Sequence, residues 1–172
     1  MTEFDESNIE FGEPVTASES FNKAVEMVER GRWEDALYYV NDALDKSYFG
    51  VDAYLLRCHI FLELQNPLEA LNDISVALKH EPFNLELKIW KTRVLVSLGR
   101  NKAAIALLNR LIGEHPGNYE VITSKGMVYY MEGELEKAEN IFIEALELAN
   151  GIPEQAANAA YWLAKVHQSK SN

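Results

Sequence analysis

The sequence has a single cysteine, no hydrophobic run long enough to cross a membrane, and no lysine or arginine among its first 16 residues. One cysteine, Cys58, excludes an intrachain disulfide, which fits a reducing compartment. A membrane-spanning helix needs a run of about 18 or more apolar residues, so its absence predicts no membrane partner. The basic region that opens a secretory signal peptide is also missing. These absences predict a cytoplasmic protein.

Positive charge is scarce. The 172 residues include 27 aspartates and glutamates but only 16 lysines and arginines, which gives a formal net charge of −11. Such a chain repels the phosphate backbone, whose neutralisation supplies most non-specific affinity for nucleic acids, so we predict no nucleic-acid partner. Residues 1–16 are polar and acidic, and we expect them to form a flexible tail. Phe4, Ile9 and Phe11 would allow this tail to dock on the protein's own surface instead.

Patterns that carry catalysis or metal binding are also missing. The four histidines are not spaced to gather metal ligands on one helix face. There is no glycine-rich phosphate loop, no nucleophile elbow and no kinase signature. We therefore predict no enzymatic activity, no metal and no cofactor. Cys58 falls among small residues and is expected to serve helix packing rather than reactivity.

What the sequence does contain is a repeated unit. Four alanines follow one another at steps of 34 residues, without insertion or deletion: Ala36, Ala70, Ala104 and Ala138. Small residues keep the same step at Ala24, Cys58, Thr92 and Gly126. Bulky apolar residues keep it at Met27, Phe61, Leu95 and Tyr129. A fixed period of this length is typical of stacked repeats, in which each unit buries its apolar face on its neighbours.

At these columns the chain resembles the tetratricopeptide repeat (TPR) family, most closely at Leu98-Gly99 with Ala104, and at Gly126 with Phe142. The resemblance implies an all-α fold, a right-handed superhelical stack of helix-turn-helix repeats. Four repeats are expected within residues 17–150, at about 17–50, 51–84, 85–118 and 119–152. A capping helix over 153–169 is expected to close the stack.

Local signals mark the expected helix ends. Gly31, Gly99 and Gly133 suit the ends of the first helices of their repeats, because a left-handed residue is favoured there. Asn66, followed by a proline, is expected to cap the second helix of its repeat, and Asn101 is expected to cap the next one.

Function in such a stack usually resides on the concave surface, which the first helix of each repeat lines. The inward columns give a predicted partner-binding groove. Its residues are Phe21, Asn22, Val25, Asp52, Leu55, Leu56, His59, Glu86, Ile89, Trp90, Arg93, Thr123, Met127 and Tyr130. Large aromatics in a groove are the usual anchors for a partner, so Trp90 and Phe21 stand out. Leu55 and Ile89 have a second interpretation, as side chains packed between neighbouring repeats.

Members of the family that bind the acidic C-terminal tails of Hsp70 and Hsp90 use lysine, asparagine and arginine in fixed inward columns. Those columns here hold Phe21, Val25, Leu56, Glu86 and Trp90. A carboxylate needs cationic donors, which these residues do not provide. We therefore expect the Hsp70 and Hsp90 tails not to be partners.

The pattern favours a protein–protein interaction module: an adaptor that binds an apolar or amphipathic segment of a partner protein or peptide. Acidic groove residues such as Asp52 and Glu86 would favour lysine or arginine beside the partner's anchors. Two alternatives remain open. One is a small acidic chaperone that shields aggregation-prone clients, and the other is a self-assembling scaffold.

Trp162 is the exception on a polar stripe of the expected capping helix, on the side where a following helix would normally pack. One interpretation is that Trp162 is exposed and joins two copies through a two-fold interface, giving a homodimer. The other is that it folds back over the alanine-rich surface and is packed within its own chain.

Overall fold

The computed structural model describes residues 16–171 except 49 and 150, and over this part of the chain it is entirely helical, with no strand. Its helices are α1 (Ala17–Glu29), α2 (Trp33–Asp45), α3 (Val51–Glu63), α4 (Pro67–His80), α5 (Leu85–Ser97), α6 (Asn101–Glu114), α7 (Tyr119–Met131), α8 (Leu135–Leu148) and α9 (Pro153–Lys170). The prediction of an all-α helical repeat stack is confirmed. The predicted acidic tail lies, apart from Thr16, outside the described residues.

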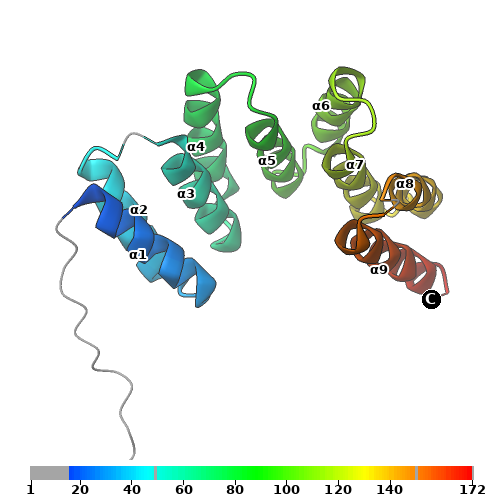
Figure 1. The fold of residues 1–172 in the computed structure, drawn as a ribbon, viewed down its shortest axis with the longest axis horizontal. Coiled ribbons are helices and arrows are strands. Elements are labelled where there is room, and N and C mark those ends of the chain that lie inside the picture. The colour runs from blue at the N-terminus through cyan, green and yellow to red at the C-terminus, as the bar shows by residue number, and fades with distance from the viewer. Residues whose placement is uncertain (1–15, 49, 150, 172) are drawn as a thin grey trace, which may run out of the picture.

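The helices begin at regular steps along the chain. The odd-numbered helices from α1 to α9 begin at Ala17, Val51, Leu85, Tyr119 and Pro153, and each start lies 34 residues after the one before. The second helices α2, α4, α6 and α8 keep the same step. Figure 1 shows the resulting pairs standing side by side along an arc that α9 closes at its C-terminal end. None of the described helices is long and apolar enough to cross a membrane.

The small columns bring the two helices of each pair together. All four repeated alanines are fully buried, as are Ala24 and Cys58 of the other small column. Burial raises the pKa of the Cys58 thiol to about 12, so it remains protonated and unreactive at neutral pH. Between pairs, each second helix packs on the first helix of the next pair. Buried apolar clusters therefore join each pair to the first helix of the next one.

The predicted turn glycines adopt the backbone conformation that the sequence indicates. Gly31, Gly99 and Gly133 have φ of 69°, 69° and 76°, in the left-handed region. After α1, the N–H of Arg32 bonds the carbonyl of Met27 at 2.9 Å, which satisfies one carbonyl that the helix end would otherwise leave free.

The predicted asparagine caps are corrected. Asn66 precedes α4, and Pro67 is its first residue, but the Asn66 side chain makes no capping bond. Asn101 is itself the first residue of α6, so it lies one position too late to cap it. The working asparagine caps belong to the first helices instead. Asn84 accepts a hydrogen bond from the N–H of Leu87 at 3.1 Å, and Asn118 does the same one repeat later.

Gly126 allows the closest approach between α7 and α8. A Cβ atom there would lie 2.7 Å from the buried ring of Phe142 and 3.0 Å from Ile141. We expect Gly126→Ala to lower the free energy of unfolding by about 1–3 kcal/mol, because overpacking exceeds the gain in helix propensity. Gly113→Ala is the matched control. Nothing lies within 4 Å of its Cβ position on α6, so this change should stabilise the protein by up to about 1 kcal/mol. Urea unfolding of both variants measures the difference, and equal effects would contradict this account.

Candidate functional site

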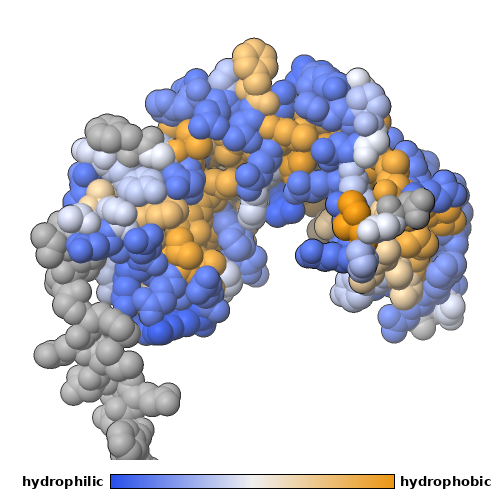
Figure 2. Space-filling model, viewed as in Figure 1, coloured by the Kyte–Doolittle hydropathy of each residue, from blue (hydrophilic) through white to orange (hydrophobic). Residues whose placement is uncertain are grey.

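The first helices of the pairs form the inner wall of the arc. Contacts join α1 to α3, α3 to α5, α5 to α7 and α7 to α9. Figure 2 shows the hollow that the arc encloses, with apolar side chains lining part of it and polar side chains over much of the outer surface. The concave surface is therefore a continuous wall built from α1, α3, α5, α7 and α9.

Most of the predicted groove residues are accessible on this wall. Asn22, Asp52, Glu86 and Arg93 are exposed. Phe21, Val25, Leu55, Leu56, His59, Trp90, Met127 and Tyr130 are partly buried. The structure corrects Ile89, which is 1% exposed and belongs to the core between α5 and its neighbours. Thr123 is also buried, and its hydroxyl donates to the carbonyl of Tyr119 in its own helix at 2.9 Å.

Phe21, the anchor candidate nearest the N-terminus, is partly covered by another ring of its own chain. The ring of Phe21 stacks on Tyr48 with centroids 4.6 Å apart. The Tyr48 hydroxyl in turn donates to the carboxylate of Asp52 at 3.1 Å. Burial and this carboxylate raise the pKa of Tyr48. Phe21 therefore offers a partner less free surface than its column in the sequence predicts.

A row of ring contacts, edge-on between Trp33 and His59 and tilted between His59 and Trp90, crosses the middle of the wall. His59 on α3 lies 5.6 Å from the ring of Trp33 and 5.2 Å from that of Trp90 on α5. The guanidinium of Arg93 lies 4.4 Å from the centroid of Trp90, in cation–π contact. Burial lowers the pKa of His59 and favours its neutral form. Trp33 was not predicted for this surface because it opens a second helix rather than a first one.

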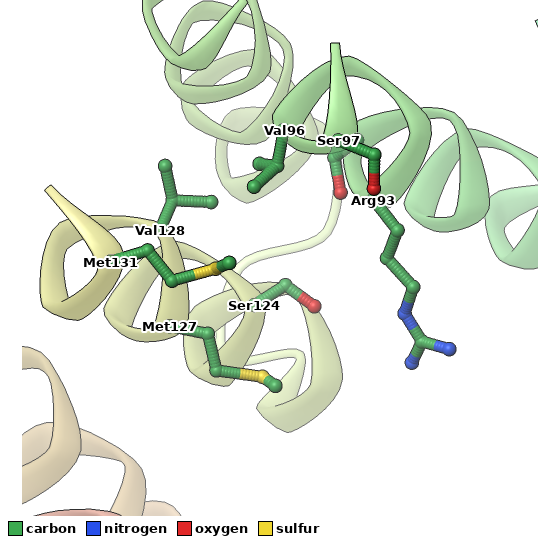
Figure 3. A pocket seen from close by; sticks show the side chains of 8 residues that line it. Arg93, Val96, Ser97, Ser124, Met127, Val128 and Met131 are labelled. Carbon is green, nitrogen blue, oxygen red and sulfur yellow. The ribbon is translucent and has the colours of Figure 1, made fainter. Parts of the chain in front are cut away.

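The clearest cavity on the wall lies between α5 and α7 (Figure 3). Its volume is about 230 Å³. The lining residues are Thr92, Arg93, Val96, Ser97, Ser124, Met127, Val128 and Met131. Figure 3 shows Met131 extending across the cavity toward α5 and the Ser124 hydroxyl directed into the space beside Arg93. We name this cavity the α5–α7 pocket.

Sequence reasoning found only part of this pocket. Arg93 and Met127 were predicted, whereas Met131 and Ser97 were missed. Each missed residue lies four positions after a predicted one, one helical turn further along the same face. Met131 is 66% exposed although it is a large apolar residue. Extending the inward columns by one turn would have found both.

A second cavity of about 440 Å³ continues the first toward α9. Both cavities are lined by Arg93, Ser124 and Met127. The second adds two carboxylates, Glu120 and Glu154, and other polar residues of α7 and α9, and we name it the α7–α9 pocket.

A hydrogen-bond pair fixes the helices on either side of the α7–α9 pocket. The Tyr119 hydroxyl donates to the carbonyl of Gln155 at 2.6 Å and lies 3.1 Å from the Asn158 side-chain oxygen. Burial raises the pKa of this tyrosine. The positions of α7 and α9, and with them Glu120 and Glu154, are therefore set before a partner arrives.

Trp162 is partly buried and packs within its own chain. Its ring stacks on Phe142 with centroids 5.7 Å apart and meets Tyr130 edge-on at the same distance. Tyr130 is tied to α9 through its hydroxyl, 3.1 Å from that of Ser169. Of the two interpretations drawn from the sequence, the structure supports the folded-back one. The homodimer itself stays a prediction.

Titratable groups on the described part of the chain form no arrangement of three or more histidine, cysteine, aspartate or glutamate side chains that could hold a metal ion. The acidic groove residues are spread along the wall. The contact between Arg93 and Glu120 is loose, with 4.0 Å between nitrogen and oxygen.

Two sequence models of the tetratricopeptide repeat match the chain, one at residues 55–119 and one at 95–166. Tetratricopeptide repeat protein 8 of Caenorhabditis elegans is 23% identical over 128 residues, which cover 74% of this chain and 25% of that protein. The DnaJ homolog subfamily C member 7 homolog of Dictyostelium discoideum is 30% identical over 83 residues, or 48% of this chain and 15% of that protein. The chain thus spans a quarter or less of the length of these relatives.

Solved structures share the fold. The thermophilic TPR protein TTC0263 of Thermus thermophilus superposes with a TM-score of 0.73 at 22% identity, over 90% of this chain and 83% of that one. MamA of Desulfovibrio magneticus RS-1 superposes with a TM-score of 0.64 at 18% identity, over 93% of this chain and 98% of MamA. YrrB, a TPR protein with an unusual peptide-binding site, superposes with a TM-score of 0.58 at 25% identity, over 91% of this chain and 78% of YrrB. With the two matching models and the 34-residue step of its helices, the chain belongs to the tetratricopeptide repeat family of protein-interaction modules.

Proposed function

We propose that this protein is an adaptor whose concave wall binds an apolar or amphipathic segment of a partner protein, with lysine or arginine beside the apolar anchors. The observation that carries the proposal is the α5–α7 pocket, an apolar cavity that opens on the concave wall next to exposed carboxylates. Apolar surface left open at such a position is the usual mark of an interaction site.

The side chains around the pocket are suited to an apolar anchor. Val96, Met127 and Val128 form its walls, and Met131 is largely exposed over it. Methionine side chains are flexible and polarisable, so they adapt to partner side chains of different shape. On the α5 side the pocket is lined by Arg93, whose guanidinium lies over the ring of Trp90.

Charge favours a basic partner. Asp52, Glu86 and Glu120 are exposed on the wall, and the whole chain carries a net charge of −11. Such a field attracts lysine and arginine, accelerates association and disfavours acidic tails. The similar structure of YrrB has an unusual peptide-binding site. For this chain we likewise propose a bound peptide, one that differs in charge from the acidic Hsp70 and Hsp90 tails.

The proposal is tested by capture of partners from a lysate of the native source with three baits: the wild type and two variants. The double change Met127→Gln and Met131→Gln keeps side-chain size but replaces apolar with polar groups. We expect it to weaken a captured partner about tenfold or more, because anchor pockets dominate such interfaces. Phe83→Ser is the control. Phe83 is 86% exposed in the turn between α4 and α5, so its loss should leave capture unchanged.

The outcomes of this capture separate the proposal from its alternatives. Equal capture by the wild type and the double methionine variant would contradict the proposal. A protected partner fragment of peptide size after limited proteolysis of the complex supports an adaptor. Binding that requires an unfolded client would favour the chaperone instead. Analytical ultracentrifugation of the protein alone tests the scaffold, which requires self-assembly.

A further inference from the structure

We propose that the two adjoining pockets bind a specific pair of side chains from an extended segment of the partner protein. An aliphatic residue enters the α5–α7 pocket, and a lysine or arginine two positions away enters the α7–α9 pocket. The Ser124 hydroxyl bonds the peptide backbone between them. This inference rests on the proposed function and adds to it the chemical class of the segment that is bound.

The surroundings of Ser124, which lines both pockets, support a bound peptide. It is 8% exposed, yet among the described residues its hydroxyl has no hydrogen-bond partner. Its neighbour Thr123, on the same helix, donates to a backbone carbonyl one turn earlier. Figure 3 shows the Ser124 hydroxyl directed toward the space beside Arg93, which lines both pockets. The hydroxyl oxygen is not fully enclosed, so it can accept a hydrogen bond from a peptide amide in place of water.

The size of the α5–α7 pocket indicates one side chain rather than a small molecule. Its volume of about 230 Å³ is below the ~300–1,000 Å³ of sites that enclose cofactors or drug-sized ligands. Its apolar lining includes Val96, Met127 and Val128. The cavity is open to the groove on one side, which allows a side chain to enter while its backbone remains outside.

The α7–α9 pocket presents acceptors for a cation. Glu120 and Glu154 contribute carboxylates from different helices, and Asn158 contributes an amide. Among the described residues, the carboxylate of Glu120 has one ion-pair contact, the loose one of 4.0 Å with Arg93, so its oxygens remain available to a lysine or arginine. Arg93 is held over Trp90, which keeps its own charge near the shared edge of the two pockets. The cationic side chain is therefore expected at the α9 side of this cavity.

The shared lining sets the spacing of the two side chains. Arg93, Ser124 and Met127 belong to both pockets, so the two subsites adjoin without an intervening wall. In an extended segment, residues i and i+2 point to the same side. The backbone amide between them then faces the protein at the edge where Ser124 lies. The expected sequence is an aliphatic residue, any residue, and then lysine or arginine, in either chain direction.

The probes are three synthetic extended peptides in a Gly/Ser background, with Leu-Ser-Lys, Leu-Ser-Glu or Ser-Ser-Lys at the centre. The readout is the NMR signal of the ¹³C-labelled methionine methyl groups. Met127 and Met131 line the pocket, whereas Met27 is buried in the core between α1 and α2 and serves as an internal control. We expect Leu-Ser-Lys to shift the first two signals and not the third. It should bind about tenfold more tightly than either control peptide at low salt.

Variants assign the two polar subsites separately. Glu120→Gln with Glu154→Gln should remove the preference for Leu-Ser-Lys over Leu-Ser-Glu. Ser124→Ala should weaken Leu-Ser-Lys and Leu-Ser-Glu by the same factor, about fivefold to tenfold. Circular dichroism confirms that each variant is folded.

The result that overturns this inference differs from the one that overturns the proposed function. Equal affinity for the lysine and glutamate peptides would contradict the proposed cation subsite. An unchanged affinity in Ser124→Ala would contradict the proposed backbone contact. Absence of any shift at Met127 and Met131 removes the aliphatic subsite. If the peptides fail these tests but the double methionine variant loses its native partner, the adaptor function is supported and the proposed peptide specificity is wrong. If that variant keeps its partner, the proposed function falls whatever the peptides do.

Discussion

Asp73→Ala should lower the free energy of unfolding by about 3 kcal/mol, although Asp73 does not line the α5–α7 pocket. Asp73 is buried on α4, and both of its oxygens accept hydrogen bonds from the guanidinium of Arg57 on α3, at 2.7 and 2.8 Å. A third bond, of 2.8 Å, joins Arg57 to the Asn41 side chain on α2. Removing the carboxylate leaves a largely buried cation without its charge partner, which typically costs about 3–5 kcal/mol. The Arg57 side chain is 21% exposed, so water offsets part of the loss and places the expectation at the lower end.

The control for this prediction is the double variant Arg57→Met with Asp73→Ala. Replacing both charges removes the unpaired cation, and buried ion pairs exchanged for apolar groups are often neutral in stability. We expect the double variant to be more stable than Asp73→Ala alone, as measured by urea unfolding with a common m-value. The bond with Asp73 raises the pKa of Arg57, so the cation persists at every practical pH. A double variant as unstable as the single one would show that Asp73 acts through packing and not through charge.

The helix pattern could be predicted because one column of small residues repeats without a gap. Ala36, Ala70, Ala104 and Ala138 require close helix contact in each unit, and that requirement is met whatever the surface residues are. Capping was less predictable. An asparagine near a helix start suits either the cap or the first turn, and Asn101 occupies the latter.

The concave site was predicted less completely. The repeat positions indicate which face of a helix points inward, but they do not indicate which side chains of other helices cover that face. Ile89 lies on an inward column and is nevertheless covered. Trp162 was placed on the correct side of α9, but only the three-dimensional arrangement brings the Phe142 ring beneath it. Ser124 lies three residues before Met127 on the same inward face, so the sequence indicates its place, and the structure adds that it lines both pockets. The ion pair between Arg57 and Asp73 joins residues 16 positions apart on two helices, and no single-helix pattern indicates such a pair.

Ala104→Glu should have the largest effect on stability, at least about 4 kcal/mol. Ala104 is fully buried on α6 among Leu95, Leu108 and Val128. A glutamate there would place a carboxylate, without a charge partner, in a contact that admits only a methyl group. Burying an unpaired charge and overpacking both destabilise, and changes that combine them are among the few that exceed about 4 kcal/mol.

Ala106→Glu on the same helix is the matched control for Ala104→Glu. Ala106 is exposed, and a glutamate there would lie four residues before Arg110, a spacing that favours an ion pair. We therefore expect its free energy of unfolding to change by less than about 0.5 kcal/mol. Because stacked repeats are coupled mainly to their neighbours, hydrogen exchange in Ala104→Glu should rise most in α5, α6 and α7 and least in α1 and α2. A uniform rise along the whole chain would contradict local coupling, and an unchanged unfolding midpoint would contradict the assignment of Ala104 to the core.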